Sequence, residues 1–338
     1  MNGLSSDKVL VSIVLPCRNE EASLPYCLTE AKRVIVENNL SAEIIVADSS
    51  TDRSPQIARE AGVVLVKHDK DGYGNAYLEG FKRAQGKYIF MADADGTYDF
   101  NELPRFLKEL QNGADLVIGN RFAGKIESGA MPTSHRYLSR IIFAFLTKIF
   151  FGLKIGDIHS GERAISREAL DRLDLRTTGM EFASEMMVKA SKKNLIITEL
   201  PINYARRQGE SKLRTLPDGW RHLRFLLLYS PTLLFLLPGI FLVLISFITL
   251  PLFSLIGYQL IIFSVFAKTY AHVHLGEPAP WLEKIYRHLT IEKASLVGLI
   301  ITGGGIIFWG SFGQLLILLG LQTIFSSFML SILGIKNR

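Results

Sequence analysis

Four long apolar runs in the last third of the chain constrain its fold more than any other feature of the sequence. From Phe225 onward the 338-residue sequence is dominated by leucine, isoleucine and phenylalanine, whereas residues 1–224 have an ordinary globular composition. A helix needs about 20 apolar residues to cross a hydrocarbon core of roughly 30 Å. The runs that approach this length are 231–250, 254–271, 294–311 and 313–333. We therefore expect a transmembrane domain over residues 231–338 with about four helices.

Basic residues fall at alternate ends of these runs. They lie before the first run, between the second and third, and after the fourth: Lys212, Arg214, Arg221, Arg224, Lys268, Lys284, Arg287, Lys293, Lys336 and Arg338. The connections near Phe253 and Phe312 carry no charge. Because basic residues accumulate on the cytoplasmic side, we expect a multi-pass integral membrane protein with its globular part and both termini in the cytoplasm. Residues 216–230, where Trp220 and basic residues flank leucines, are predicted to form an amphipathic helix at the lipid interface.

The net charge of +6 is compatible with anionic lipid, phosphate substrates or nucleic acid. The sequence has no recognition-helix pattern, zinc-finger spacing or aromatic–basic platform, so we expect no nucleic-acid partner. In a membrane protein, lipid headgroups and orientation account for such a charge. Cys17 and Cys27 form no metal or redox motif, which is typical of a reducing compartment.

Residues 1–215 are predicted to form one α/β domain. Short β-branched segments alternate with amphipathic helical patterns, and a further strand-like segment follows at 195–204. The first five strands are expected at 9–15, 44–47, 63–66, 88–91 and 116–119. This alternation predicts a Rossmann-like, mainly parallel sheet covered by helices. Such sheets bind ligands at the carboxyl ends of their strands.

A polar, turn-forming cluster follows each of the first four predicted strands. The strongest chemical signal among them is the pair Asp93 and Asp95. Two carboxylates one residue apart at a strand end can hold Mg²⁺ or Mn²⁺ together with substrate phosphates. A cation there would neutralise charge on a leaving diphosphate. An acidic turn or helix cap is the alternative, and an EF-hand is excluded because Pro104 stands at the twelfth position.

Glycines and basic residues give further signals for phosphate. Gly72 and Gly74 open a predicted helix, whose free amide groups favour an anion, although an ordinary turn is the alternative. Guanidinium groups bind phosphate through paired hydrogen bonds, and about half of the basic residues beyond the sheet are expected to touch substrate. These residues are Arg121, Arg136, Arg140, Arg163, Arg206, Arg207 and Lys212.

The order of these motifs resembles glycosyltransferase family 2, and within it the dolichol-phosphate mannosyltransferase or polyprenyl-phosphate glycosyltransferase branch. The resemblance covers roughly residues 9–225. Its motifs are Pro16 with Asn19-Glu20, Asp48 to Asp52, Gly72 to Gly74, Asp93-x-Asp95, Gly119-x-Arg121, His135-Arg136, Asp157 to Gly161-x-Arg163, Glu181-Phe182 to Glu185, and Arg207 to Ser211-Lys212. Two positions depart from the pattern, since Ala47 replaces a frequent Asp and Thr97 replaces a frequent Gln.

This resemblance implies a GT-A fold and an inverting transfer of a hexose. The donor would be a UDP- or GDP-sugar, and the acceptor a polyprenyl or dolichyl phosphate at the cytoplasmic membrane face. The implied cofactor is Mg²⁺ or Mn²⁺ on Asp93 and Asp95, and a homo-oligomer is left open. The implied donor-binding residues are Pro16, Asn19, Glu20, Asp48, Gly72, Gly74 and Asp93. The implied acceptor-phosphate residues are Arg121, His135, Arg136, Ser139, Arg163, Ser211 and Lys212. The implied catalytic residues are Asp95, Arg121, Arg136 and Arg207.

The chemistry of a phosphate acceptor fits a site rich in arginine. A phosphate monoester is largely a dianion near pH 7, so it can attack the anomeric carbon without a strong general base. The enzyme then needs mainly positioning and charge neutralisation. Were the acceptor a hydroxyl, Glu185 could serve as a base; otherwise Glu181 and Glu185 would orient the basic cluster. His159 would either contact a phosphate or fix its own loop.

The sequence is also compatible with two other functions. One is a membrane glycosyltransferase that acts on a polysaccharide or a lipid hydroxyl, although the Gln-x-x-Arg-Trp motif of processive members is missing before the apolar runs. The other is a non-catalytic lipid- or sugar-binding membrane subunit, against which the intact acidic and basic sets argue.

Overall fold

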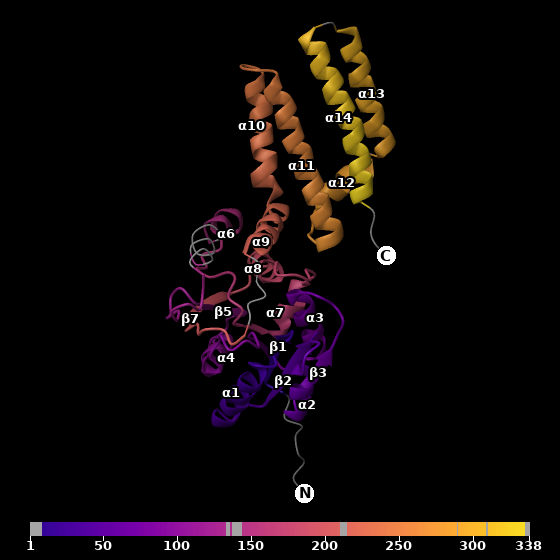
Figure 1. The fold of residues 1–338 in the computed structure, drawn as a ribbon. Helices are drawn as coiled ribbons and strands as arrows, with labels where there is room; N and C mark the ends of the chain where they lie inside the picture. Colours follow the sequence, from indigo (N-terminus) through magenta and orange to yellow (C-terminus); the bar gives the residue numbers. More distant parts are fainter. Residues whose placement is uncertain are drawn as a thin grey trace. The chain divides into compact units, whose positions relative to one another are not determined.

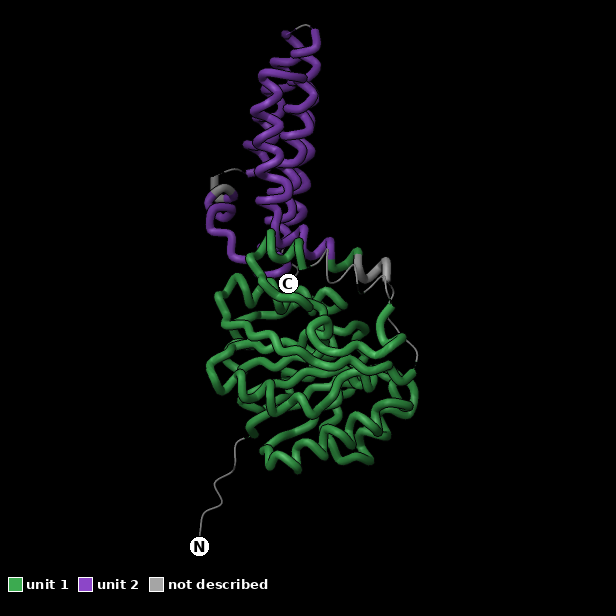
Figure 2. Tube along the Cα trace, turned by 90° about the vertical axis from the view of Figure 1, so that its left-hand side faces the viewer, with its two compact units in different colours: residues 1–222 green, residues 223–338 purple. Residues whose placement is uncertain are grey.

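The computed structural model describes residues 9–132, 136, 144–209, 215–288, 290–308 and 310–334. The chain divides into two compact units, residues 1–222 and residues 223–338, which are coloured separately in Figure 2. The boundary falls inside helix α9 (Thr215–Tyr229), which contains most of the segment predicted to lie at the lipid interface. The interfacial position of that segment stays a prediction.

A seven-stranded sheet forms the centre of the first unit, with the strand order β3-β2-β1-β4-β6-β5-β7. All neighbouring strands are parallel except at β6, which runs antiparallel to both β4 and β5. The strands are β1 (Val11–Cys17), β2 (Ala42–Asp48), β3 (Val64–Lys67), β4 (Tyr88–Met91), β5 (Leu116–Asn120), β6 (Arg163–Ser166) and β7 (Ile197–Pro201). The predicted mainly parallel α/β sheet is confirmed. The sequence pattern predicts six of these strands and does not predict β6.

Helices cover both faces of this sheet (Figure 1). Alternate residues of β1, such as Ile13 and Leu15, share one hydrophobic cluster with α1 (Leu24–Glu37), α2 (Ser54–Glu60) and α4 (Leu103–Gln111). Val14 points to the other face, where it lies against Gly80 of α3. That face also carries α8, which packs on α3. The other helices described in this unit are α3 (Tyr73–Arg83), η1 (Phe100–Glu102), α6 (Ala144–Phe151), α7 (Arg167–Leu173) and α8 (Phe182–Lys192).

The second unit is helical, and a helix lies at each of the four predicted places. Two of them, α11 and α14, are long and apolar enough to cross a membrane within the described residues. A third span results if Trp220–Tyr229 and Thr232–Ser246, which are bent by 82° to each other, count as one. The elements are a π-helix (Thr232–Leu236), α10 (Leu237–Ser246), α11 (Leu252–Leu275), α12 (Pro280–His288), α13 (Ile291–Ile307) and α14 (Ser311–Leu333).

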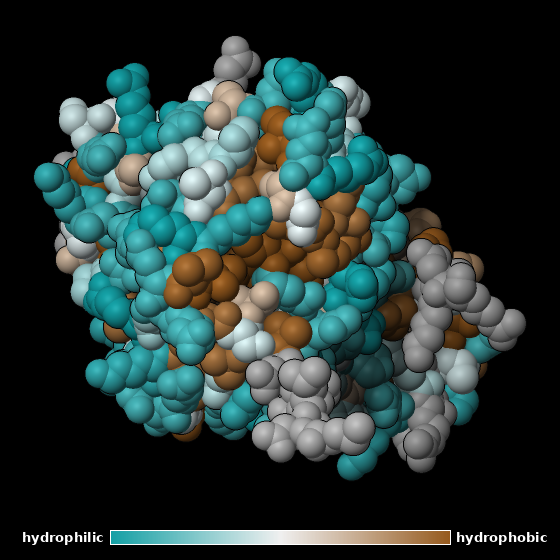
Figure 3. All heavy atoms as spheres, turned by 90° about the horizontal axis from the view of Figure 1, so that it is seen from below, coloured by the Kyte–Doolittle hydropathy of each residue, from teal (hydrophilic) through white to brown (hydrophobic). Residues whose placement is uncertain are grey.

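Exposed hydrophobic side chains differ between the two units. Most of the large ones belong to the second unit, as expected for helices that face lipid; examples are Phe247, Ile248 and Ile307. Figure 3 shows a face on which hydrophilic residues surround a central hydrophobic patch. Val36 on α1 is the most exposed large hydrophobic residue that the structure describes in the first unit.

Glycines let the helices of the second unit approach each other closely in pairs. A Cβ atom on Gly298 of α13 would lie 2.7 Å from the carbonyl oxygen of Gly320 on α14, and one on Gly320 would lie 2.6 Å from that of Gly298. Gly239 and Gly257 face each other in the same way between α10 and α11. Small residues at helix crossings are typical of membrane proteins, where close packing replaces the hydrophobic effect. Gly303, by contrast, has nothing within 4 Å of a Cβ position.

We expect Gly298→Leu to lower the free energy of unfolding by about 1–3 kcal/mol, because the larger side chain has no space against α14. Thermal unfolding in detergent measures this loss. Gly303→Leu makes the same change in the same helix at an open position, and it should leave the unfolding temperature close to that of the unaltered protein. Equal losses in the two variants would contradict the glycine-packing argument.

Candidate functional site

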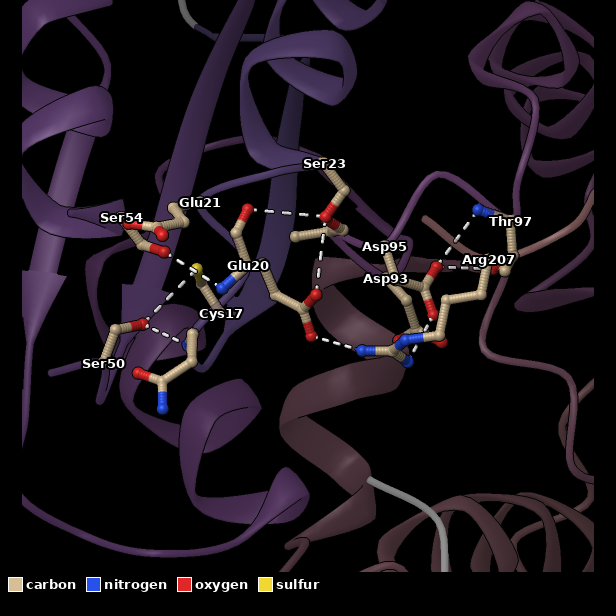
Figure 4. Close-up of polar contacts among 12 residues, drawn as sticks. Cys17, Glu20, Glu21, Ser23, Ser50, Ser54, Asp93, Asp95, Thr97 and Arg207 are labelled. Carbon is tan, nitrogen blue, oxygen red and sulfur yellow. Dashed lines mark hydrogen bonds and ion pairs between the residues drawn. The ribbon is translucent and has the colours of Figure 1, made fainter. Parts of the chain in front are cut away.

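The two carboxylates predicted to form the site lie just beyond the carboxyl end of β4. Asp95 is buried, with 5% of its surface exposed. Its Oδ1 atom accepts hydrogen bonds from the backbone amide of Thr97 at 3.1 Å and from the Thr97 hydroxyl at 2.6 Å (Figure 4). Thr97 therefore fixes one carboxylate oxygen and leaves Oδ2 to face the rest of the site.

Arg207 joins this strand end to two distant parts of the chain. Its Nη1 atom donates to Oδ2 of Asp95 at 2.7 Å, and its Nη2 atom donates to Glu20 (Figure 4). The segment that carries Arg207 is itself attached to the Asp95 turn, since the amide of Gln208 donates to the Asp95 carbonyl at 3.0 Å. Charge-assisted hydrogen bonds of this kind are stronger than neutral ones. The predicted acidic pair and a predicted catalytic arginine thus meet at one edge of the sheet.

Asp93 is held in a different way. It is partly buried, and its Oδ1 atom accepts a hydrogen bond from the Tyr73 hydroxyl at 3.0 Å. Burial and then the negative charge of Asp95 raise the pKa of Asp93 to about 7. The Tyr73 hydrogen bond and the positive charges of Arg207 and Arg121 act in the opposite direction. Two carboxylates that repel each other in a poorly solvated place favour a cation.

The residues present fit a divalent cation whose remaining ligands come from substrate. Asp93 and Asp95 supply the hard oxygen donors that Mg²⁺ and Mn²⁺ prefer. Within the described ranges, no group of three or more His, Cys, Asp or Glu residues could hold a metal ion. Mg²⁺ is commonly bound by one or two carboxylates plus substrate phosphates and water, so a two-carboxylate site is sufficient.

Arg121 follows β5 and is locked in a buried ion pair. Its Nε and Nη2 atoms donate to the two carboxylate oxygens of Asp157 at 2.6 and 2.8 Å. The guanidinium also lies over the ring of Tyr204. Asp157 was recognised only as part of a motif, and the structure gives it this role as the partner of Arg121. Arg121 still lies near enough to Asp93 to oppose the rise in its pKa.

The structure contradicts the assignment of Arg163 to the acceptor phosphate. This side chain is 1% exposed. All three guanidinium nitrogens donate to backbone carbonyls, those of Ser160, Ala183 and Ile158, at 2.8 to 3.0 Å. Burial lowers the pKa of Arg163, and these carbonyls satisfy its donors. Arg163 therefore supports the loops that lead into β6 and α8 instead of binding an anion.

Two of the backbone amides expected to be free at this helix start are already engaged. The amide of Gly74 donates to the Gly179 carbonyl at 3.3 Å, and that of Asn75 donates to the Thr178 carbonyl at 3.1 Å. A Cβ atom on Gly72 or Gly74 would lie within 2.3 Å of the carbonyl oxygens of Thr178 and Thr177. The glycines are required because another loop packs here, which corrects the expectation that this helix start is open to phosphate.

The edge next to β2 and β3 carries the residues expected to bind the nucleotide. Asp48 is fully buried and pairs with Nζ of Lys67 at 2.7 Å. Asn19 has a positive φ of 52° and accepts the amide of Thr51 at 2.8 Å, close to Pro16 at the end of β1. A shallow hollow lies beside them, lined by Ser49, Ser50, Thr51, Lys67, His68 and Asp69. Lys67 was not predicted, although its place as the last residue of β3 could have indicated it.

Five of the predicted acceptor residues make no side-chain contact that the structure describes. His135, Ser139, Ser211 and Lys212 lie outside the described residues. Arg136 is described and exposed, and its backbone amide donates to the Pro132 carbonyl at 3.1 Å. The acceptor roles of these five residues stay predictions.

Glu185 is used inside the fold. It is fully buried, pairs with Lys189 at 2.7 Å and accepts the amides of Arg176 and Thr177 at 2.8 to 3.0 Å. The Thr177 hydroxyl donates to it as well, at 2.6 Å. A carboxylate with these partners is a poor general base. Glu185 holds the loop at Arg176 and Thr177 in place, and in the described structure its contacts are not with the basic residues predicted to bind substrate.

His159 lies 3.3 Å from the Ser184 hydroxyl, measured from its Nε2 atom. This contact joins the segment before β6 to α8 and supports the loop-fixing alternative for His159.

Comparisons with known proteins agree with this geometry. The family model described as Glycosyl transferase family 2 matches residues 12–174. The low-salt glycan biosynthesis hexosyltransferase Agl6 of Haloferax volcanii is 36% identical over 96% of this chain and 89% of its own length. A dolichyl-phosphate hexose transferase of the same organism is 30% identical over 62% of this chain and 89% of its own. The undecaprenyl-phosphate mannosyltransferase of Micrococcus luteus is 32% identical over 60% of this chain and 87% of its own.

Solved structures resemble the fold of the first unit. The glucosyl-3-phosphoglycerate synthase of Mycobacterium tuberculosis, solved with Mn²⁺, uridine diphosphate and glucosyl-3-phosphoglycerate, has a TM-score of 0.53 at 20% identity. The likeness covers 65% of this chain and 80% of that one. The predicted GT-A fold is confirmed.

We expect Glu185→Ala to lower the free energy of unfolding by about 3–5 kcal/mol, because it leaves the Lys189 ammonium buried without its partner. Thermal unfolding in detergent measures the loss. The control is Glu37→Ala, which removes a surface ion pair with Arg33 on α1 and should leave the unfolding temperature nearly unchanged, because solvent screens exposed pairs. A Glu185→Ala variant as stable as the control would show that the pair is not structural.

Asp93→Asn should stabilise the metal-free protein increasingly as the pH rises. The folded state keeps a proton on Asp93 up to about pH 7, whereas the unfolded chain loses it near the ordinary aspartate value. The free energy of unfolding therefore falls as the pH rises from the ordinary aspartate pKa to about 7. The asparagine side chain does not titrate, so the variant avoids this loss. Unfolding temperatures at pH 5 and pH 8 in a chelating buffer measure the effect. Asp99→Asn, at an exposed aspartate in the same loop, should show no such pH-dependent gain.

Proposed function

Because the chain belongs to glycosyl transferase family 2 and is a hexosyltransferase of its polyprenyl-phosphate branch, we propose that it transfers a hexose from a UDP- or GDP-sugar to a polyprenyl or dolichyl phosphate. The transfer would invert the anomeric carbon, since the acceptor attacks it directly. The observation that carries this proposal is the contact of Asp95 and Glu20 with Arg207, beside Asp93, at the carboxyl edge of the sheet.

Asp93 and Asp95 would hold a Mg²⁺ or Mn²⁺ ion, which when bound would neutralise charge on the leaving nucleoside diphosphate. The presence of Mn²⁺ and uridine diphosphate in the mycobacterial synthase of similar fold supports this assignment. Arg207 brings a positive charge to the same place, and Glu20 and Asp95 fix its direction. Preorganised charges of this kind contribute most where negative charge develops during the reaction.

The nucleotide would lie along the ends of β1, β2 and β3. Pro16, Asn19 and Asp48 line this edge, and Lys67 adds an ammonium group that neutralises Asp48. The hollow beside Ser49 and Lys67 offers hydroxyl, ammonium and imidazole groups to a base or ribose. We propose this hollow as the nucleoside subsite.

The occupied Glu185 favours a phosphate acceptor over a hydroxyl. A hydroxyl acceptor needs a base. The carboxylate considered for this role, that of Glu185, already pairs with Lys189 and accepts hydrogen bonds from Arg176 and Thr177. A phosphate dianion needs positioning by cations instead. We propose Arg121, His135, Arg136, Ser139, Ser211 and Lys212 for this task and leave Arg163 out.

The acceptor lipid explains why the catalytic domain is joined to apolar helices. Relatives named for dolichyl phosphate and undecaprenyl phosphate support a long prenyl chain as the acceptor tail. The basic residues at alternate helix ends support a cytoplasmic position for the catalytic domain and both termini.

The test is an assay of the purified full chain in detergent with Mn²⁺, polyprenyl phosphate and a panel of nucleotide sugars. We expect one donor to give a lipid-linked sugar that mass spectrometry identifies. Asp95→Asn should reduce the rate at least about 100-fold, because it removes a charge from the cation site. Asp99→Asn, the same change at an exposed position nearby, should keep the rate close to normal.

Full activity in Asp95→Asn would refute the assigned site. A polymeric product, or sugar on a lipid hydroxyl, would support the second enzymatic alternative. Donor binding without turnover over any acceptor would support a non-catalytic subunit.

A further inference from the structure

Asp93 depends on one side chain for its position. Within the described part of the chain, the Tyr73 hydroxyl is the one side-chain donor that reaches it, at 3.0 Å from Oδ1. Asp95, in contrast, is held by Thr97 and Arg207 together. Of the two acidic side chains, Asp93 is therefore the one whose direction rests on a single contact.

The ring of Tyr73 is fixed by other aromatic rings. It packs edge-on against Tyr77, with ring centres 5.0 Å apart, and against Phe182 of α8 at 6.4 Å. Tyr77 stacks in turn on Phe182 at 5.5 Å. Aromatic pairs at these distances are favourable beyond the area that they bury. The cluster thus determines where the Tyr73 hydroxyl lies.

The backbone on both sides of Tyr73 is clamped as well. Gly72 and Gly74 flank it, and both lie so close to the carbonyl oxygens of Thr177 and Thr178 that a Cβ atom would clash. Gly72 has a φ of 118°, which a residue with a side chain rarely adopts. The start of α3 is therefore held against the 177–179 loop, and Tyr73 cannot turn away with its backbone.

The 177–179 loop is anchored by the buried carboxylate of α8. Glu185 accepts both backbone amides at Arg176 and Thr177 and the Thr177 hydroxyl, and it pairs with Lys189. A continuous set of contacts therefore runs from Glu185 through the loop and the start of α3 to the Tyr73 hydroxyl. It ends on Asp93.

We propose that Tyr73 is a positioning residue that holds Asp93 in the direction needed to bind the cation. This inference rests on the proposed cation site. Hydrogen bonds from neighbouring side chains orient carboxylate ligands, and the loss of such a bond typically weakens metal binding by about 10- to 100-fold. Without the Tyr73 hydroxyl, no other described side-chain donor would hold Asp93 in one direction in the metal-free state, and the cation would have to restore that direction on binding.

The test compares Tyr73→Phe with Tyr77→Phe in the full chain. Both variants lose one hydroxyl from the same helix and the same aromatic cluster, but Tyr77→Phe keeps the Tyr73 hydroxyl that donates to Asp93. Mn²⁺ binding is measured by titration calorimetry with uridine or guanosine diphosphate present. We expect Tyr73→Phe to weaken Mn²⁺ binding about 10-fold and Tyr77→Phe to leave it close to that of the unaltered protein.

A kinetic measurement separates positioning from general damage. In Tyr73→Phe the Mn²⁺ concentration for half-maximal rate should rise by the same factor, while the rate at saturating Mn²⁺ is largely restored. The unfolding temperature in a chelating buffer should be similar for the two variants, which checks that both are folded.

Three results would overturn the inference. Normal Mn²⁺ affinity in Tyr73→Phe would refute the role of Tyr73 and leave the cation site intact. Equal weakening in Tyr73→Phe and Tyr77→Phe would assign the effect to ring packing instead of the hydrogen bond. Absence of Mn²⁺ binding in the unaltered protein would refute the proposed cation site itself, and this inference with it.

Discussion

The mutual repulsion of Asp93 and Asp95 is the constraint around which the catalytic unit is organised. Two carboxylates held in a poorly solvated strand end are unfavourable unless positive charge or hydrogen-bond donors compensate them. The chain supplies Thr97 from the same turn, and it supplies two further groups from elements distant in sequence, Tyr73 at the start of α3 and Arg207 in the segment after β7. The buried Glu185 and the closely packed Gly72 and Gly74 contribute indirectly, because they fix the loop and the helix start that position Tyr73. A site ready for a cation is therefore a property of several loops together.

Much of the fold was predictable because its signals are local. Alternating β-branched and amphipathic segments identify β1 to β5, and the apolar runs identify the helices of the second unit. β6 was missed because its four residues begin with an arginine and end with a serine, which leaves too short an apolar run to recognise. The first apolar run is interrupted by a π-helix before α10, which the sequence pattern does not predict. Only tertiary packing decides where such a break occurs.

The site was predictable in its residue types and less so in its contacts. Asp93 and Asp95 lie at the expected strand end and Arg207, which the family resemblance implied, contacts Asp95 there; the roles of all three residues stay predictions. Arg163 looked like the other arginines, and only the structure reveals that backbone carbonyls take all of its donors. Gly72 and Gly74 indicated a close backbone approach, but the sequence does not say whether a phosphate or another loop approaches. Tyr73 carried no signal of its own, because a tyrosine in an amphipathic helix is ordinarily a packing residue.

The reversed direction of β6 has a consequence for where sequence change can be tolerated. Arg163, its first residue, pairs with Met91 at the end of β4 and with Ile118 of β5. In the parallel strands the chain leaves the sheet at the edge that binds ligand, whereas in β6 the chain enters the sheet at that edge. The stretch from Asp157 to Glu162 therefore borders the catalytic edge, and the junction of Ser166 with α7 lies at the far edge. Insertions near the start of α7 would lie far from the site, whereas insertions before Arg163 would displace Asp157 and with it the guanidinium of Arg121.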